Sequence, residues 1–211
     1  MAADGNIAAV LLAAGRSRRM GAFKPLLPFG GVSVAEACVA ALRAGGAGEV
    51  VVVVGHRGAE VRAALAHLGG LRFASNEAAG SEMGVSVARG VEAVSEGADA
   101  VLVALVDQPA VPPSEIRRLV EARRRTGALL VLPEWEGRGG HPVLVDLSLR
   151  GELSGVVPEK GLRALFDAHR AGVLRVPAGS PYVARDMDTR EEYAALHAEV
   201  FGSPPPGGAG V

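Results

Sequence analysis

Short apolar runs alternate with segments of mixed polarity along most of the chain. Runs such as 50–54 and 100–106 are strand-length and continuously apolar, which is typical of strands that are buried on both faces. The segments between them carry apolar residues at helical spacing, as Ile116, Leu119 and Val120 do. The pattern predicts strands at about residues 7–12, 49–54, 71–75, 100–106 and 129–133. It predicts helices between them at about residues 33–44, 57–67, 83–95 and 114–126.

The regular alternation of predicted strands and helices ends after Pro133. The later pattern predicts a turn at 134–138, a short strand at 142–145, a helix at 159–169, a strand near 173–176 and a final helix at about 190–200. Alternation of strands and helices belongs to the α/β class. We therefore predict a three-layer α/β/α sandwich with a mainly parallel, Rossmann-like sheet, whose ligand binds beyond the carboxyl ends of the strands.

Composition limits the number of domains, the partners and the cellular location that we expect. With 211 residues, 49% of them apolar, the chain can form one domain with a sizeable core, and we expect that domain to span 1–200. The Pro- and Gly-rich stretch 201–211 is expected to be a disordered tail. A net charge of −1 and 4% aromatic residues argue against nucleic-acid or membrane partners. We see no signal peptide, and the single Cys38 excludes an internal disulfide, so a cytoplasmic setting is expected.

The most informative segment, residues 10–27, begins within the first predicted strand. Small residues follow the apolar run, and then come three arginines, a second glycine and a lysine. Small residues let backbone amides approach a ligand closely, and the basic side chains can donate charge-assisted hydrogen bonds to phosphate oxygens. The segment is neither a P-loop nor a dinucleotide fingerprint. It predicts a polyphosphate site, the alternative being a basic surface loop.

The same segment resembles the signature of MobA-like nucleotidyltransferases, written roughly LA(A/G)GxSxRMGxxK. The matching residues are Leu12, Ala13, Ala14, Gly15, Ser17, Arg19, Met20, Gly21 and Lys24. The resemblance implies a fold of the nucleotide-diphospho-sugar transferase type, and it implies that these residues bind a nucleotide. It further implies that Arg19 and Lys24 act on the phosphates during catalysis.

Carboxylates stand where such a fold would place a metal. Asp107 directly follows a predicted strand, and an acid that faces a triphosphate needs a cation between them, so it suggests Mg²⁺. A turn-forming aspartate is the alternative. Asp186 and Asp188 share one face of an extended segment. The alternative is that one acid here only caps the last helix or interacts with its dipole, and Asp188 and Thr189 both suit that role. In the family that the chain resembles, the position of Asp107 is a metal-binding and catalytic aspartate, and the segment of Asp186 and Asp188 can supply a second metal ligand.

Three further segments match the family. The segment 76–86 resembles a stretch that contacts the base and ribose, and it implies nucleotide-binding roles for Asn76, Met83, Gly84 and Ser86. Glu82 replaces the usual glycine there, and Ser81 or Glu82 can alternatively act as a helix cap. The sequence Gly-His-Pro-Val around His141 resembles a segment near the acceptor substrate, so His141 is either a substrate contact or a structural histidine. Residues 160–163 resemble the family stretch that follows, with Glu159 in place of its aspartate.

The resemblance predicts nucleotidyl transfer with release of pyrophosphate. The pair Ala13-Ala14 and the sequence Asp107-Gln108-Pro109 are most similar to molybdenum cofactor cytidylyltransferases, which implies CTP, a molybdopterin acceptor, Mg²⁺ and transient contact with a molybdenum hydroxylase. Three alternatives remain open. They are a related transferase with another nucleotide or phosphorylated acceptor, a nicotinamide-dependent reductase on the same fold, and a nucleotide-binding adaptor without turnover.

Overall fold

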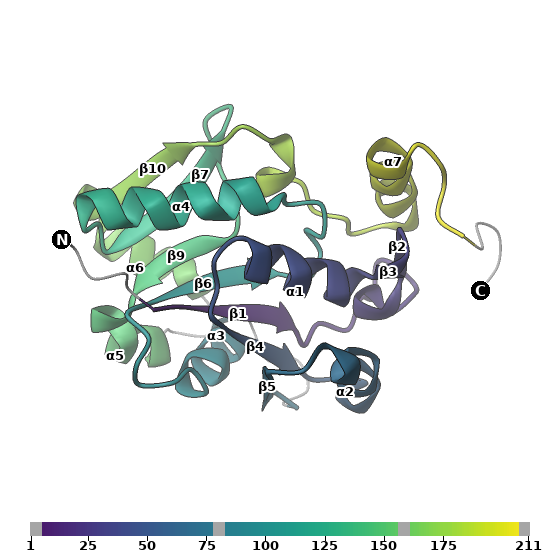
Figure 1. Cartoon of the computed structure of the whole chain (residues 1–211), viewed down its shortest axis with the longest axis horizontal. Coiled ribbons are helices and arrows are strands. Elements are labelled where there is room, and N and C mark those ends of the chain that lie inside the picture. Colours follow the sequence, from purple (N-terminus) through teal and green to yellow (C-terminus); the bar gives the residue numbers. More distant parts are fainter. Residues whose placement is uncertain (1–5, 78–82, 156–160, 207–211) are drawn as a thin grey trace.

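A single mixed sheet forms the centre of the molecule in the computed structural model, which describes residues 6–77, 83–155 and 161–206. The strand order across the sheet is β10-β7-β9-β6-β1-β4-β5 (Figure 1). The short strand β8 pairs with β7. The strands are β1 (Ile7–Ala13), β4 (Glu49–Val54), β5 (Leu71–Ser75), β6 (Ala100–Leu105), β7 (Leu130–Trp135), β8 (Arg138–Gly139), β9 (Val143–Asp146) and β10 (Val173–Pro177). The predicted α/β class with a mainly parallel sheet is confirmed.

The sheet departs from a purely parallel arrangement at β9. This strand is antiparallel to both β6 and β7 and lies between them. It is reached through β7 and β8, which form a hairpin where the sequence pattern predicts only a turn at 134–138. That prediction was wrong in extent, because β7 continues through Trp135 and β8 begins at Arg138. Glu136 and Gly137 alone form the turn, and both have positive φ (48° and 77°), as a tight hairpin turn requires.

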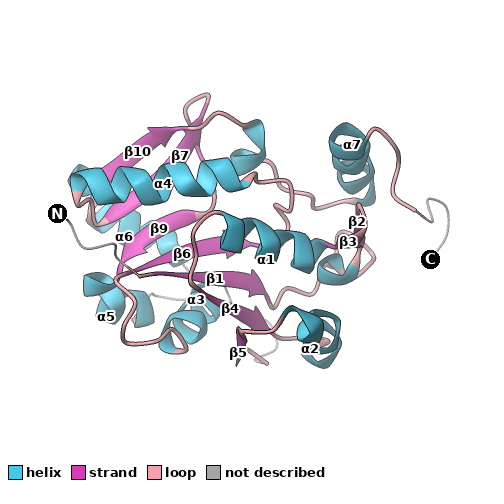
Figure 2. Cartoon of the chain, viewed as in Figure 1, coloured by secondary structure: helices cyan, strands magenta, loops and turns pink. Residues whose placement is uncertain are grey.

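Helices cover both faces of the sheet (Figure 2). Alternate residues of β1 enter opposite cores, with Leu11 in one and Leu12 in the other, so the strand is buried on both sides. One face is covered by α1 (Val34–Ala44), α2 (Gly58–Leu65) and α4 (Pro113–Thr126). The other is covered by α3 (Met83–Glu92), α5 (Arg150–Ser154) and α6 (Gly161–Ala168). The predicted three layers are therefore present.

A small subassembly lies beyond the carboxyl end of β1. It consists of the hairpin β2 (Pro28–Phe29) and β3 (Val32–Ser33) together with α7 (Arg190–Phe201), which Figure 1 shows beside it. The Tyr193 hydroxyl donates a hydrogen bond of 2.5 Å to the Pro28 carbonyl, which joins the two parts. This contact brings the end of the chain back to the loop that follows β1.

Several predicted boundaries shift slightly. Helix α2 ends at Leu65 and continues as a 3₁₀ turn, and α3 ends at Glu92. The predicted helix start at Glu159 and the tail residues 207–211 lie outside the described residues. No helix within the described ranges is both long enough and apolar enough to span a bilayer.

Candidate functional site

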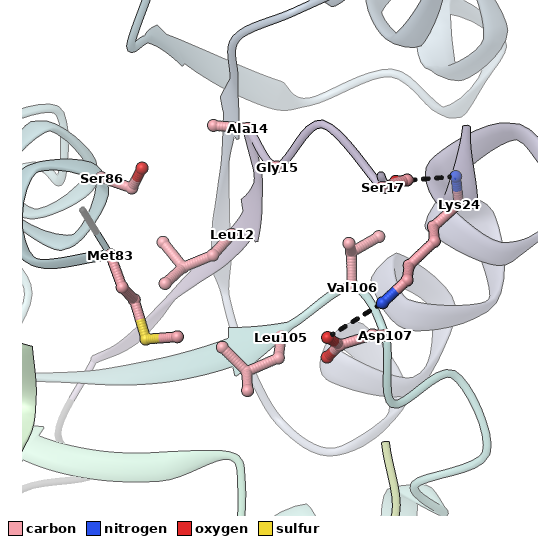
Figure 3. A pocket seen from close by; sticks show the side chains of 10 residues that line it. All are labelled: Leu12, Ala14, Gly15, Ser17, Lys24, Met83, Ser86, Leu105, Val106 and Asp107. Carbon is pink, nitrogen blue, oxygen red and sulfur yellow. Dashed lines mark hydrogen bonds and ion pairs between the residues drawn. The ribbon is translucent and has the colours of Figure 1, made fainter. Parts of the chain in front are cut away.

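A cavity of about 260 Å³ opens at the carboxyl ends of β1 and β6 (Figure 3). Its described lining comes from the end of β1 and the loop that follows it, the start of α3, and the end of β6 with the turn that follows. The lining residues are Leu12, Ala14, Gly15, Ser17, Lys24, Met83, Ser86, Leu105, Val106 and Asp107. The cavity therefore lies where an α/β sheet of this kind binds its ligand.

The loop after β1 places Lys24 inside this site. Ser17 has a positive φ of 52°, and its hydroxyl accepts a hydrogen bond of 3.1 Å from the backbone amide of Lys24. Lys24 begins a short 3₁₀ turn, Lys24–Leu26, in which Pro25 needs no amide partner. The Lys24 residue is only 7% exposed. A buried ammonium group requires anionic partners nearby.

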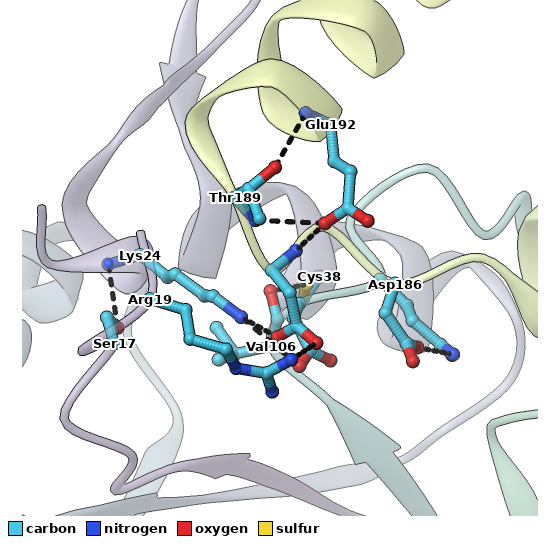
Figure 4. A network of polar contacts seen from close by, with 11 residues as sticks. Ser17, Arg19, Lys24, Cys38, Val106, Asp186, Thr189 and Glu192 are labelled. Atoms are coloured by element: carbon cyan, nitrogen blue, oxygen red, sulfur yellow. Dashed lines mark hydrogen bonds and ion pairs between the residues drawn. The ribbon is translucent and has the colours of Figure 1, made fainter. Parts of the chain in front are cut away.

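Those partners are two aspartates from distant parts of the chain. The Lys24 Nζ atom lies 2.6 Å from Asp188 Oδ1 and 3.6 Å from Asp107 Oδ2. The Arg19 guanidinium lies 2.7 Å from Asp188 Oδ2, while its own side chain remains 74% exposed (Figure 4). The structure thus brings together the predicted catalytic residues Arg19, Lys24 and Asp107 with the predicted metal ligand Asp188.

The two aspartates have opposite electrostatic environments. Burial raises the pKa of Asp107 above its ordinary value, and the neighbouring Asp186 and Asp188 add to the increase against the opposing effect of Lys24. The hydrogen bond from Lys24 instead lowers the pKa of Asp188. The Oδ1 atom of Asp107 is buried and has no hydrogen-bond partner. Burial therefore disfavours the ionised form of Asp107, and an additional cation beside this carboxylate would stabilise that form.

The acidic segment before α7 is held by the backbone. The buried Met187 donates its amide to the Asp107 carbonyl at 3.0 Å, which places Asp186 and Asp188 on either side of that contact. Asp186 accepts a hydrogen bond of 2.7 Å from Nε2 of the buried Gln108. All three acids therefore lie at one edge of the sheet.

A capping box fixes the orientation of Asp188. Thr189 is the N-cap of α7 and accepts a hydrogen bond of 3.2 Å from the Glu192 amide. The Glu192 carboxylate accepts hydrogen bonds from the amides of Thr189 and Asp188, at 2.9 Å and 2.7 Å. Our sequence interpretation assigned no role to Glu192 or to Gln108. The spacing Thr-x-x-Glu is a readable signal for the first, whereas the contact between Gln108 and Asp186 spans 78 residues and has no local signal.

These residues fit a divalent cation. Mg²⁺ prefers one or two carboxylates and completes its coordination with water and substrate phosphates. Within the described ranges no three acidic, histidine or cysteine side chains gather into a complete metal site. The unpartnered Asp107 Oδ1, with Asp188 and Asp186 nearby, nevertheless provides the type and number of donors that Mg²⁺ uses when a triphosphate supplies the rest.

Some of the other predicted nucleotide-binding residues line the cavity, and others are buried in the core or in α3. Ala13 and Met20 are 0% and 1% exposed in the core, so their side chains cannot touch a ligand and only their backbones can contribute. Gly84 is buried in α3, and Gly21 is exposed with a positive φ of 66°. Asn76 donates a hydrogen bond of 2.8 Å to the Ser86 hydroxyl, which lines the cavity. Ser81 and Glu82, with the rest of 78–82, lie outside the described residues.

The predicted substrate contact His141 lies away from this cavity. Its Nδ1 atom is 3.3 Å from the Val103 carbonyl, and since a carbonyl only accepts, Nδ1 carries the proton. Burial lowers the pKa of His141, although the Val103 carbonyl and Asp186 act in the opposite direction. His141 is therefore neutral near pH 7, and it lines a second cavity, which lies among β7, β9, α6 and β10.

Comparison with known proteins points to one family. Residues 9–173 match the model of the MobA-like NTP transferase domain. The chain is 32% identical over 197 residues to nicotine blue oxidoreductase of Paenarthrobacter nicotinovorans, covering 90% of this chain and 96% of the relative. It is 31% identical over 202 residues to a probable molybdenum cofactor guanylyltransferase of Mycobacterium avium, covering 93% and 98%.

Solved structures show the same fold. A nucleotidyl transferase from Methanothermobacter thermautotrophicus superposes with a TM-score of 0.78 at 28% identity, over 92% of this chain and 97% of the other. Rv0371c of Mycobacterium tuberculosis, solved in complex with manganese, superposes with a TM-score of 0.77 at 27% identity, over 91% and 97%. A divalent metal is therefore present in the structure of one similar protein.

Proposed function

The chain belongs to the MobA-like NTP transferase family, and from that premise we propose that it transfers CMP from CTP to the phosphate of molybdopterin and releases pyrophosphate, with Mg²⁺ as cofactor. Its membership indicates a nucleotidyltransferase that uses an NTP and a phosphorylated acceptor. CTP and molybdopterin are the finer part of the proposal. They rest on Ala14 in the loop after β1 and on the Asp107-Gln108 turn.

One observation carries the proposal. The buried Lys24 ammonium lies between Asp107 and Asp188 at the wall of a cavity large enough for part of a nucleotide. Phosphoryl-type transfer needs positioned charge more than it needs a protein nucleophile. A lysine that can turn from carboxylates to phosphate oxygens, beside acids that can hold a cation, supplies that charge.

Each residue then has a part in the reaction. Backbone amides of the loop from Ala14 to Gly21 bind the β- and γ-phosphates, and the exposed Arg19 side chain lies beside them. Lys24 contacts the α-phosphate, where negative charge develops as the acceptor oxygen attacks. Asp107, with Asp188 or Asp186, would hold Mg²⁺, which neutralises phosphate charge when bound.

The acceptor needs no strong base. A phosphate monoester is already anionic near neutral pH, so its oxygen can attack the α-phosphorus without losing a proton to the protein. The neutral His141 donates its Nδ1 proton to a carbonyl and lines a different cavity, so it has no role in deprotonating the nucleophile. Positioning by the protein is the main contribution.

Pyrophosphate release tests the proposal directly. The purified chain is supplied with Mg²⁺, molybdopterin and CTP, GTP or ATP in parallel, and pyrophosphate is measured over time. We expect release with CTP that depends on both Mg²⁺ and the acceptor. Release with GTP alone would replace the nucleotide in the proposal, and no release from folded protein with any nucleotide would refute it.

A reductase is a second candidate because of one comparison. The name of the Paenarthrobacter relative describes an oxidoreductase, and the two chains match over nearly their whole lengths. A hydride-transfer site has no need for acids that hold a cation, so the pairing of Lys24 with Asp107 and Asp188 favours the transferase. Oxidation of NADH or NADPH in the presence of a quinone-like dye, independent of Mg²⁺ and unaffected by Asp107→Asn, would favour the reductase.

A further inference from the structure

Gln108 lies in the turn that follows β6, and its side chain is buried although it carries a polar amide. The residue is 7% exposed. It lines a small cavity of about 20 Å³ together with side chains that are mostly apolar, among them Cys38, Leu42 and Ile116. Amide side chains are seldom buried among apolar groups unless their polar atoms have partners. The partners of this amide therefore indicate why the fold keeps it there.

Only one end of the Gln108 amide has a partner among the described residues. Its Nε2 atom donates a hydrogen bond of 2.7 Å to Asp186 Oδ1. A carboxylate accepts hydrogen bonds and does not donate them, so the nitrogen faces Asp186 and the amide oxygen points away. That Oε1 atom is buried, and no described group donates to it. A buried acceptor without a partner lowers the free energy of unfolding, so Gln108 is kept at a cost in stability.

The bond to Asp186 lies beside a second tether between the same two segments. The Met187 amide donates a hydrogen bond of 3.0 Å to the Asp107 carbonyl. Two hydrogen bonds from neighbouring residues therefore hold the acidic segment against the turn after β6. Asp188 comes next in the chain and is held from its other side by the capping box of α7. The Gln108 amide thus fixes one end of the segment that presents both acids.

A neutral tether suits this position because the acids repel one another. Asp186 and Asp188 carry the same charge as Asp107. The contacts of Lys24 Nζ with Asp188 (2.6 Å) and Asp107 (3.6 Å) offset that repulsion. In the proposed reaction Lys24 turns to the nucleotide, and the Gln108 amide would still hold Asp186 in that state. Because the amide is uncharged, it leaves the charge of the carboxylates available to a cation.

We propose that Gln108 is a positioning residue of the cation site. Its amide keeps the acidic segment close to Asp107, so that one divalent cation can bind carboxylates of both. Gln108 itself contacts neither the cation nor the nucleotide, and its loss leaves the carboxylates free to move apart. This inference rests on the proposed transferase function, because that reaction is the reason to expect a cation between these acids and the phosphates.

Replacing Gln108 with methionine tests the proposal because the two expected effects have opposite signs. Methionine is unbranched, as glutamine is, and carries neither end of the amide. The Mn²⁺ affinity of the nucleotide-free chain should fall by about 10- to 100-fold, the range that is typical when a partner of a metal ligand is removed. The melting temperature should equal or exceed that of the wild type, because the unpartnered oxygen is gone and water can solvate the exposed Asp186.

Leu42→Met is the matched control. Leu42 lines the same small cavity, and the exchange conserves volume without changing a polar group, so this variant should bind Mn²⁺ as the wild type does. Mn²⁺ binding is measured by the electron paramagnetic resonance signal of the free ion, and melting by circular dichroism without metal. Unchanged Mn²⁺ affinity in Gln108→Met overturns the proposal. A lower melting temperature or a failure to fold also overturns it, because Gln108 would then serve the fold.

Pyrophosphate release on the same preparations separates this inference from the transferase proposal. If both hold, Gln108→Met should need about tenfold more Mg²⁺ for half-maximal release, while kcat at saturating Mg²⁺ stays close to that of the wild type. Weaker Mn²⁺ binding in Gln108→Met, together with no release by the wild type with any nucleotide, would refute the transferase proposal and leave the positioning role standing. Release by the wild type with unchanged Mg²⁺ dependence in the variant would overturn the positioning role alone.

Discussion

Lys24 Nζ and Asp188 Oδ1 lie 2.6 Å apart although 164 residues separate them in the chain. The contact joins the loop after β1 to the segment that enters α7. It also means that Lys24 competes with a metal ion for the same carboxylates. The same ammonium lies 3.6 Å from Asp107, so in the absence of substrate Lys24 neutralises the two acids that we propose as metal ligands.

Replacing Lys24 with methionine should separate its two effects. Loss of a charge-assisted contact to the α-phosphate should lower turnover by roughly 10- to 150-fold. Without the ammonium, the nucleotide-free protein should bind Mn²⁺ more tightly, because Asp107 and Asp188 then lack their internal cation. Turnover is measured by pyrophosphate release, and Mn²⁺ binding by the electron paramagnetic resonance signal of the free ion.

Arg72→Met is the control for that experiment. Arg72 is exposed on β5 and pairs with Glu49 at 2.8 Å, so its loss should change neither turnover nor Mn²⁺ affinity. If Lys24→Met binds Mn²⁺ no better than the wild type does, the acids next to Lys24 do not form a cation site.

Asp107→Asn should remove activity without lowering stability at neutral pH. Burial raises the pKa of Asp107, so the folded state holds this proton more tightly than the unfolded state does. The protonated form therefore contributes to the free energy of unfolding at pH values below the ordinary pKa of aspartate. This contribution is lost as the pH rises through the raised pKa of the folded state. The melting temperature of the variant should equal or exceed that of the wild type at pH 7, and the difference should vanish in acid.

Asp146 provides a control, because its pKa is shifted in the direction opposite to that of Asp107. Although burial acts to raise its pKa, hydrogen bonds from Ser148 and Arg123 outweigh that effect and lower it. The ionised Asp146 carboxylate therefore stabilises the protein at pH values above the ordinary pKa of aspartate, and this contribution is lost as the pH falls through the lowered pKa of the folded state. Asp146→Asn should therefore melt below the wild type at pH 7. A lower melting temperature for Asp107→Asn at pH 7 would contradict the electrostatic argument for a cation at that position.

The sequence predicted the central layers well because burial imposes a regular pattern. Continuous apolar runs such as 50–54 can form only buried strands or buried helices, and their length decides for strands. The orientation of β9 was not predictable in the same way. Its residues are apolar whichever direction the strand takes, and the hairpin turn that reverses the chain depends on Glu136 adopting a positive φ, which is uncommon for that residue.

The site was predictable only in its local parts. The first motif predicted roles for Arg19 and Lys24, and the position after a strand predicted one for Asp107; the structure brings these side chains together around Asp188 and Lys24. The motif could not indicate that the Met20 side chain faces the core, since an apolar residue in a glycine-rich loop can face either way. Nor could it indicate that Gln108 holds Asp186, because that contact depends on the folded chain.

Gly90 should tolerate no side chain. It lies on the face of α3 that packs on the sheet, and a Cβ atom there would lie 2.3 Å from Val10 Cγ1 and 2.9 Å from Val53 Cγ2. Gly90→Ala should destabilise the protein by about 1–3 kcal/mol through overpacking. Gly97→Ala is the control, because nothing lies within 4 Å of its added methyl group. Equal denaturant midpoints for the two variants would show that α3 can move away from the sheet at little cost.

Ala14→Gly should relax the preference for CTP. The Ala14 side chain lines the first cavity, so its methyl group reduces the space that is left there for a base. Removing it should raise the ratio of kcat/KM for GTP to kcat/KM for CTP by roughly 10- to 200-fold, the range expected for a difference of one methylene-sized group. Ala13→Gly is the matched control, because the Ala13 side chain is buried in the core on the opposite face of the sheet, and its loss should lower stability without changing the ratio. An unchanged ratio in Ala14→Gly would show that the base is selected elsewhere, and the pair Asn76 and Ser86 would be the next positions to vary.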